Sequence, residues 1–170
     1  MLDIKIHKAT DLTTAEQFYN MQRTTLRQFG VSVSSLSSGW QNNEYSYMIV
    51  GWDNDTMVGG MRLDIDHHTL PMPLSYPLPS VYKDISDYGN VAEICAMWTM
   101  GIKGLPMQLL IKSIQLADRL DLKAVYAFAN EYTKKYVDTL GFKTMKGYGK
   151  EGLFYYPTKQ YPSWVMRRGR

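Results

Sequence analysis

The sequence contains one cysteine in 170 residues, which excludes an internal disulfide framework and any metal site built from several cysteines. It has no apolar run long enough to span a membrane, and its first eight residues lack the apolar stretch of a signal peptide. Its net charge of +3 is compatible with an anionic ligand and far short of a nucleic-acid-binding domain. We therefore expect a cytoplasmic protein with no membrane span and no nucleic-acid partner.

The composition is otherwise that of an ordinary globular protein, with 45% hydrophobic and 21% charged residues. A chain of this length can bury the core of one domain and is short for two, so we expect a single domain over residues 1–170. The thirteen tyrosines and four tryptophans indicate a lined pocket, an interface or an aromatic-rich core.

The first thirty residues predict a strand followed by a helix. Apolar residues alternate with polar ones from Leu2 to Ile6, as in a half-buried strand. The run Thr13-Thr14-Ala15-Glu16 has the pattern of a capping box and predicts a helix that ends at Gly30. Residues 31–39 are rich in serine and predict a loop.

The middle of the chain predicts a hairpin and a long connection. Strands over residues 45–52 and 56–65 are separated by turn residues, and Gly59 and Gly60 in the second strand indicate a bulge or a close backbone approach. Residues 66–90 hold four of the seven prolines. A connection of this length is usually functional or disordered, and its apolar residues favour an irregular but packed lid.

The most informative stretch runs from Val91 to Phe142. It predicts a buried strand (91–98), a glycine loop, an amphipathic helix that begins near Pro106, a second strand (124–129) and a short helix before Gly141. A glycine loop that opens a helix after a buried strand is a site for anionic phosphate, although a plain glycine turn has the same pattern.

The last part of the chain predicts two strands, over residues 142–146 and 152–156. The basic residues at the C-terminus are most simply a solvated tail; they are Arg167, Arg168 and Arg170. The order of elements predicts a mixed α/β sheet.

This order and several of its motifs resemble the GNAT superfamily of acyl-CoA-dependent N-acyltransferases, over nearly the whole chain. The resemblance is carried by the hairpin strand Gly59 to Leu63, the loop and helix from Lys103 to Leu110, and Asn130 followed by Gly141-Phe142. The family's loop motif is Q/R-x-x-G-x-G/A. Gly104 matches its first glycine, whereas Pro106 replaces the second and Gly101 replaces the Gln or Arg, whose positive charge Lys103 could supply.

The middle third is most similar to the autoinducer-synthase and N-acyl-amino-acid-synthase branch. That branch has a Gly-x-x-Arg-Leu strand, a long proline-containing crossover and a strand that opens with Glu, as at residues 59–63, 66–90 and Glu93 here. The Arg that follows this Glu in autoinducer synthases is absent, and the acidic residues before the first hairpin strand are replaced by Gln41-Asn42-Asn43-Glu44. These departures argue against S-adenosylmethionine as substrate, and the branch itself suggests an acyl donor longer than acetyl.

The resemblance implies a GNAT-like α/β fold, with a central, mostly antiparallel twisted sheet flanked by helices and an acyl-CoA site at a splayed pair of strands. The backbone N–H groups at the start of the helix would hold the donor's pyrophosphate, with Lys103 adding charge. The residues expected to bind the donor are Trp98, Gly101, Ile102, Lys103, Gly104, Leu105, Met107 and Asn130.

Two residues of the strand 91–98 are candidates for chemistry. Glu93 lies in an otherwise apolar strand, and burial would suit it to act as a general base, directly or through a water. The alternative is a structural carboxylate paired with Arg62 or a lysine. Cys95 lies two residues on and could be a nucleophile, but a lone buried cysteine is usually a small apolar residue.

The short helix offers a candidate acid. Tyr136 could protonate the leaving thiolate, although packing is the plainer role and the tyrosine of the superfamily stands one position later, at Val137 here. Tyr132 lies on another face. Asn130 could hydrogen-bond the pantetheine arm of the donor or cap the short helix.

Two further sets of residues suggest a functional site but have a simpler structural explanation. Asp64, Asp66, His67 and His68 resemble a metal cluster, but adjacent histidines do not easily face one ion, so we expect a polar strand end and no metal. Trp40, Trp52 and Trp98 could line an acyl pocket, with core packing as the default.

The resemblance implies an N-acyltransferase that moves an acyl group from acetyl-CoA, a longer acyl-CoA or an acyl-carrier protein to a small amine or amino acid. Two alternatives stay open. One is an ordinary acetyl-CoA-dependent N-acetyltransferase, and the other is a non-catalytic acyl-CoA-binding or regulatory domain.

Overall fold

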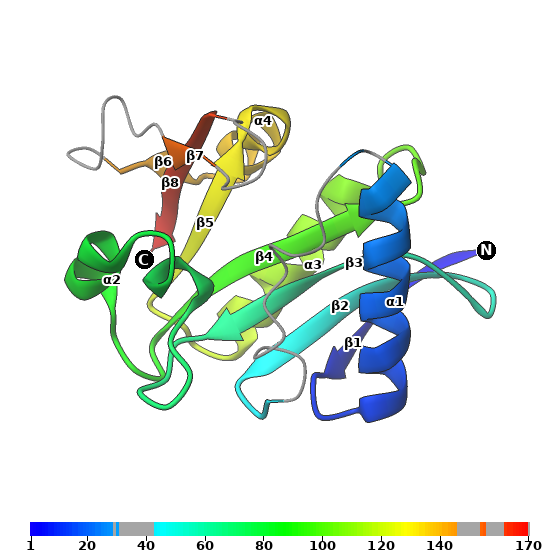
Figure 1. Cartoon of the computed structure of the whole chain (residues 1–170), viewed down its shortest axis with the longest axis horizontal. Helices are drawn as coiled ribbons and strands as arrows, with labels where there is room; N and C mark the ends of the chain where they lie inside the picture. The colour runs from blue at the N-terminus through cyan, green and yellow to red at the C-terminus, as the bar shows by residue number, and fades with distance from the viewer. Residues whose placement is uncertain (29, 31–42, 146–153, 156–161, 170) are drawn as a thin grey trace. The chain divides into compact units, whose positions relative to one another are not determined.

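The computed structural model describes residues 1–28, 30, 43–145, 154–155 and 162–169 (Figure 1). Its elements are, in chain order, β1 (Leu2–Lys8), α1 (Leu12–Gln28), β2 (Ser46–Asp53), β3 (Thr56–Ile65), the 3-10 turn η3 (Pro73–Ser75), α2 (Pro79–Ile85), β4 (Val91–Thr99), α3 (Leu105–Arg119), β5 (Ala124–Asn130), α4 (Glu131–Thr139), β6 (Lys143–Thr144), β7 (Phe154–Tyr155) and β8 (Pro162–Gly169). Among the described residues, no helix is long and apolar enough to cross a membrane.

The chain divides into two compact units. Unit 1 comprises Met1–Leu63 and Ala96–Ser113, and unit 2 comprises Asp64–Cys95 and Ile114–Arg170. The strands β3 and β4 and the helix α3 each have one end in unit 1 and the other end in unit 2.

Unit 1 is built on β1, β2 and β3. The first two strands pair antiparallel from Leu2↔Asp53 to Lys8↔Tyr47, and β2 and β3 are neighbours in the predicted hairpin. The helix α1 covers one face, where Phe18 lies so close to Gly60 that an added Cβ would stand 2.5 Å from its ring. The other face receives Leu105 of α3, which would stand 2.7 Å from a Cβ on Gly59. Consecutive strand residues point to opposite faces, so this glycine pair lets a helix approach each side.

Unit 2 is built on β4, β5 and β8. The strand β5 pairs in parallel with β4 from Val91↔Ala124 to Ile94↔Ala127 and antiparallel with β8 along its whole length. The short strands β6 and β7 also pair antiparallel with β8. The core of this unit joins the connection to the sheet; its buried members are Met72, Leu74, Val81, Ile85, Val91, Ala124, Tyr126 and Val165. The mixed α/β fold with a mostly antiparallel sheet is thus as predicted.

Three predictions about local structure were wrong. The C-terminal basic residues are not a solvated tail, because Arg167 and Arg168 lie in β8 beside β5. The connection is not wholly irregular, because Pro79 begins α2 and buries Val81 and Ile85 one turn apart. The cap of α1 is Asp11, whose carboxylate accepts hydrogen bonds from the N–H and the hydroxyl of Thr14 at 3.3 and 2.8 Å.

Other predictions hold or lie outside the described residues. Gly30 and Gly141 have positive φ, as expected of glycines that end a helix. The predicted loop 31–39 lies outside the described residues, as do Trp40, Arg170 and residues 146, 152, 153 and 156 of the two predicted C-terminal strands. The described parts of those strands contain β6 and β7, of two residues each.

Candidate functional site

The glycine loop between β4 and α3 lies in unit 1 and has the backbone conformation that only glycine adopts readily. Gly101 and Gly104 have φ of 76° and 81°. A Cβ on Gly101 would meet nothing within 4 Å, so the conformation, rather than space, requires glycine there. The loop is closed by a hydrogen bond from the Leu105 N–H to the Ile102 carbonyl at 3.2 Å.

The start of α3 is fixed against the sheet. Leu105 is fully buried, and its side chain occupies the space left by Gly51 and Gly59, at 2.9 and 2.7 Å from a Cβ built on each. In the first turn, the Leu105 N–H donates to Ile102, the Gln108 N–H donates to the Gly104 carbonyl at 3.2 Å, and Pro106 has no N–H, so an anion would be held by the other N–H groups of the loop and helix start. A fixed helix start with Lys103 exposed beside it has the chemistry of an anion site.

Glu93 lies on β4 in unit 2 and is 3% exposed. The backbone N–H of Leu74, in the turn η3 of the connection, donates a hydrogen bond of 2.8 Å to its Oε1. Leu74 is itself fully buried. The carboxylate is therefore held by the segment predicted to be a lid, an arrangement that the sequence did not suggest because backbone donors leave no signal in it.

Cys95 contacts the end of β3. Its thiol donates to Oδ2 of Asp64 at 3.0 Å, and Asp64 is fully buried. A thiol that donates to a carboxylate is protonated, whereas a nucleophile needs the thiolate. The arrangement favours the plain role for Cys95.

The residues around α4 lie in unit 2. Asn130 ends β5, and its Oδ1 accepts hydrogen bonds from the backbone N–H and the hydroxyl of Thr133 at 3.1 and 3.2 Å. The side-chain oxygen of Asn130 thus caps α4, one of the two roles predicted for it. Tyr136 is half-buried in the next turn, with the ammonium of Lys135 5.1 Å from its ring centre. Its role as an acid stays a prediction.

Trp98 lies near the end of β4 in unit 1. It is 3% exposed and packs edge-on against Phe18 of α1, with ring centres 5.9 Å apart. The same cluster contains Ala15, Tyr19, Met48, Val50 and Met57. The packing role is therefore plain in the structure, and donor binding by Trp98 stays a prediction.

Two buried polar side chains, Arg62 on β3 and Gln22 on α1, make contacts that the sequence did not predict. Arg62 is 5% exposed, and its guanidinium donates to the hydroxyl of Tyr19 at 2.7 Å. One turn later on α1, Gln22 is also buried and donates to the carbonyl of Ala96 at 2.9 Å. Ala96 has φ of 58°, which is unusual for a residue other than glycine, so the backbone of β4 turns locally at this point. The signal in the sequence was a glutamine on the apolar face of a helix.

Asp66 is the organising residue of the connection. Its fully buried carboxylate accepts from the Met72 N–H at 3.2 Å and the Tyr82 hydroxyl at 3.0 Å through Oδ1, and from the Asp87 N–H at 3.1 Å through Oδ2. Burial, followed by the hydrogen bond to Asp66, raises the pKa of Tyr82. Asp66 thus stabilises the connection. No group of three or more His, Cys, Asp or Glu in the described ranges could hold a metal ion.

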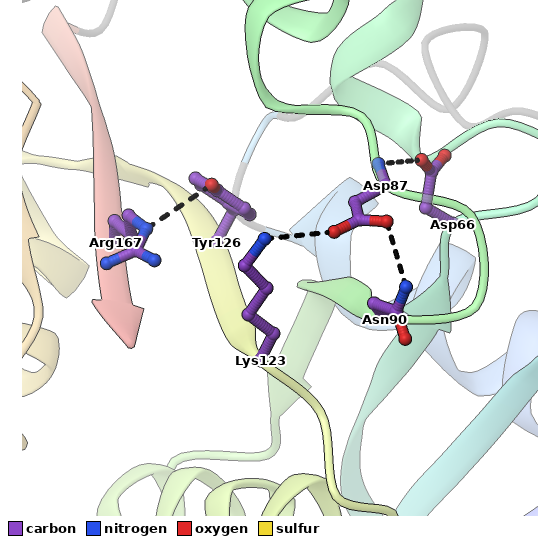
Figure 2. A network of polar contacts seen from close by, with 6 residues as sticks. All are labelled: Asp66, Asp87, Asn90, Lys123, Tyr126 and Arg167. Carbon is purple, nitrogen blue, oxygen red and sulfur yellow. Dashed lines mark hydrogen bonds and ion pairs between the residues drawn. The ribbon is translucent and has the colours of Figure 1, made fainter. Parts of the chain in front are cut away.

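Asp87 extends this network to the surface (Figure 2). Its carboxylate accepts from Asn90 at 2.9 Å and from the Lys123 ammonium at 3.2 Å. These two hydrogen bonds hold the pKa of Asp87 below its usual value. Figure 2 also shows Arg167 of β8 directed at the Tyr126 hydroxyl of β5, 3.3 Å from its Nε.

The predicted site residues divide between the units. The loop 101–107 and Trp98 belong to unit 1, whereas Glu93, Asn130 and Tyr136 belong to unit 2. Within unit 2, the structure joins Glu93 to the connection through the Leu74 N–H.

Comparison with known proteins supports the fold. The sequence matches no protein-family model and no curated protein. Solved structures are similar, however, among them an N-acyl amino acid synthase, FeeM, from uncultured soil microbes, with a TM-score of 0.74 and 13% identity over 99% of this chain and 90% of that one. ElaA of Escherichia coli has a TM-score of 0.71 and 14% identity over 99% of both chains. The CoA-dependent acyl-homoserine lactone synthase BjaI, solved with SAM and isopentyl-CoA, has a TM-score of 0.71 and 13% identity over 100% of this chain and 85% of that one.

At such identities the likeness establishes the fold. The fold that the GNAT resemblance implies is therefore confirmed, and two of the similar structures are named as an N-acyl amino acid synthase and a CoA-dependent acyl-homoserine lactone synthase.

Proposed function

We propose that this chain, acting as one domain, is a cytoplasmic N-acyltransferase. It moves an acyl group from acyl-CoA, or from an acyl-carrier protein, to a small amine or amino acid. The observation that carries the proposal is the course of β4. This single strand bears the buried carboxylate of Glu93 and then leads directly into the positive-φ glycines that open α3.

Each part of the reaction has a candidate group on the chain. The N–H groups at the start of α3, with Lys103, would hold the donor's pyrophosphate, and Asn130 would face the pantetheine arm. Glu93 would accept the proton that the amine loses as its nitrogen attacks the thioester carbon. Tyr136 would protonate the thiolate as the C–S bond breaks. The residues call for no metal.

The synthase branch is favoured over simple acetyl transfer by the connection 66–90. This segment carries η3 and α2, packs its own core against β4, β5 and β8, and contacts Glu93. A packed segment beside the base can shape a pocket for an acceptor or an acyl chain. The FeeM likeness points the same way, because that protein is an N-acyl amino acid synthase.

The test is thermal shift with CoA, acetyl-CoA and longer acyl-CoAs, followed by turnover on a panel of amines and amino acids. A donor that binds the folded state raises the melting temperature. We expect Glu93→Gln to abolish turnover and to leave the donor-induced shift intact. The matched control is Asp118→Asn, which neutralises an exposed carboxylate at the end of α3 and should keep full activity.

Three outcomes separate the alternatives. Turnover of acetyl-CoA alone would identify an ordinary N-acetyltransferase. Donor binding without turnover over the whole panel would favour the non-catalytic reading. Full turnover by Glu93→Gln would remove this residue from the mechanism.

A further inference from the structure

The connection 66–90 is closed on itself by Asp66. The Asp66 N–H donates to the Val91 carbonyl at 2.9 Å, and its carbonyl accepts from Gly89 at 2.8 Å, so its backbone joins the two ends of the segment. Its carboxylate meanwhile reaches three points inside the segment, at Met72, Tyr82 and Asp87.

One of these points lies directly before the turn that contacts Glu93. Met72 N–H donates to Asp66, and Leu74, two residues later in η3, donates to Glu93. The turn between them is short, and the Ser75 N–H donates to the Met72 carbonyl at 2.9 Å. Pro73 and the buried Leu74 restrict its movement further. Displacement of Met72 therefore displaces the Leu74 N–H as well.

We propose that Asp66 is a positioning residue for Glu93, acting through the Met72–Leu74 turn. The assignment rests on the proposed function, since it gives Asp66 a role only if Glu93 is the base. Asp66 touches no reacting atom. It fixes the place from which the Leu74 N–H orients the carboxylate, and the hydroxyl of the half-buried Tyr82 holds Asp66 in turn.

This role differs from simple stabilisation of the segment. A carboxylate buried with three donors would stabilise the connection wherever it lay. Here the fixed turn delivers a hydrogen-bond donor to an otherwise apolar strand, at the residue whose orientation decides whether an amine can be deprotonated. Misplacement of a reacting group by about 1 Å can cost a factor of about 100 in rate.

The variants that test this are Asp66→Asn and Tyr82→Phe, with Tyr76→Phe as the matched control. Tyr76 belongs to the same segment but is 94% exposed, so its hydroxyl is remote from the network. Asn at position 66 keeps the shape of the side chain but turns an N–H₂ group towards one of the three donors. Tyr82→Phe removes one donor alone and keeps the test available if Asp66→Asn does not fold.

Two readouts do not depend on activity. We expect the Leu74 amide to exchange its hydrogen about tenfold faster in Asp66→Asn than in the unaltered protein. The side-chain carboxyl ¹³C signal of Glu93 should move at constant pH in both network variants. Neither readout should change in Tyr76→Phe.

The kinetic readout is the division between kcat and KM. We expect kcat of Asp66→Asn to fall about tenfold, with the KM for the acyl donor unchanged, because the donor is held elsewhere on the chain. Tyr82→Phe should show a smaller loss in the same direction.

The inference and the proposed function fail in different ways. If Glu93→Gln is inactive but the Leu74 and Glu93 signals of both network variants match the unaltered protein, Asp66 has no positioning role and the proposed function stands. If Glu93→Gln is fully active, the proposed mechanism fails, and the positioning role fails with it.

Discussion

Unit 1 contains two pairs of glycines, Gly59–Gly60 on β3 and Gly101 with Gly104 before α3, and they are required for different reasons. Gly59 and Gly60 on β3 have ordinary strand conformation, and added Cβ atoms would stand 2.7 Å from Leu105 and 2.5 Å from Phe18. Gly101 and Gly104 have positive φ and are not crowded: an added Cβ would meet nothing within 4 Å on Gly101 and the Gln108 side-chain nitrogen at 3.9 Å on Gly104. The first pair is needed for packing and the second for backbone conformation.

The difference separates stability from ligand binding within one unit. Gly59 and Gly60 leave room for a helix on each face of β3, so their substitution is expected to affect folding first. A loop whose glycines have positive φ, with little packed against them, lets a ligand approach its backbone, so substitution there is expected to affect conformation and binding. Substitutions at four positions test this separation, beginning with the largest expected effect.

Gly60→Ala should have the largest effect on stability. The new methyl group would overlap the ring of Phe18, and the Ile49 carbonyl 3.2 Å away leaves no alternative position. Overpacking of this kind typically costs about 1–3 kcal/mol. Urea denaturation at constant m-value measures the loss. Gly101→Ala, which meets no atom within 4 Å, is the control for conformation without crowding. An unchanged midpoint for Gly60→Ala would contradict the packing role.

Gly59→Ala is expected to affect both stability and donor binding, because Gly59 packs against Leu105 at the start of α3. The nearest atom to its new methyl group is the flexible end of Leu105, so the stability loss should be about 1 kcal/mol, at the lower end of the overpacking range. Leu105 is the first residue of α3, and pushing it shifts the N–H groups that would hold the donor. We expect weaker acyl-CoA binding by calorimetry, whereas Gly60→Ala at a temperature where it is folded should bind normally. Equal donor affinity in both variants would show that the helix start does not depend on Leu105.

Gly104→Ala should cost about 1 kcal/mol through its left-handed conformation alone. Gly104→Asn separates strain from binding, because asparagine tolerates positive φ while still placing a side chain beside the loop. We expect Asn to restore the denaturation midpoint but to leave acyl-CoA affinity reduced. If Asn restored both, the loop would not be where the donor's phosphates approach.

The glycine loop shows which features of the fold can be predicted from the sequence. Its position after a buried strand and before a helix is visible in the pattern, and so are the hairpin and the close approach at Gly59-Gly60. Local signals identify these features because each depends on a few neighbouring residues. The strand β8 was missed because its second half contains Arg167 and Arg168, whose charges are typical of a solvated tail, and because its pairing with β5 is made by backbone groups distant in sequence.

The candidate site shows the same limit. Glu93 stood out as an acid in an apolar strand, but its contact with Leu74 depends on the course of a connection with four prolines. Asp66 looked like part of a metal cluster because the sequence places it beside two histidines, whereas the fold turns it towards three donors that lie 6 to 21 residues away. Tertiary hydrogen bonds of this kind have no local pattern.

Lys103→Ala should have the smallest effect on the fold and still weaken the donor site. Its side chain is exposed beside the helix start, so the denaturation midpoint should not change. An exposed charge near a bound phosphate is worth on the order of 1 kcal/mol, which corresponds to about a fivefold rise in the dissociation constant for acyl-CoA. The difference between the variant and the unaltered protein should shrink as salt is added, because screening acts on the charge and leaves backbone donors in place. Lys112→Ala, two turns further along α3, is the matched control and should bind with unchanged affinity. If both variants lost affinity for acyl-CoA equally, the charge effect would come from the positive charge of the helix as a whole. The loop would then not be the specific phosphate site.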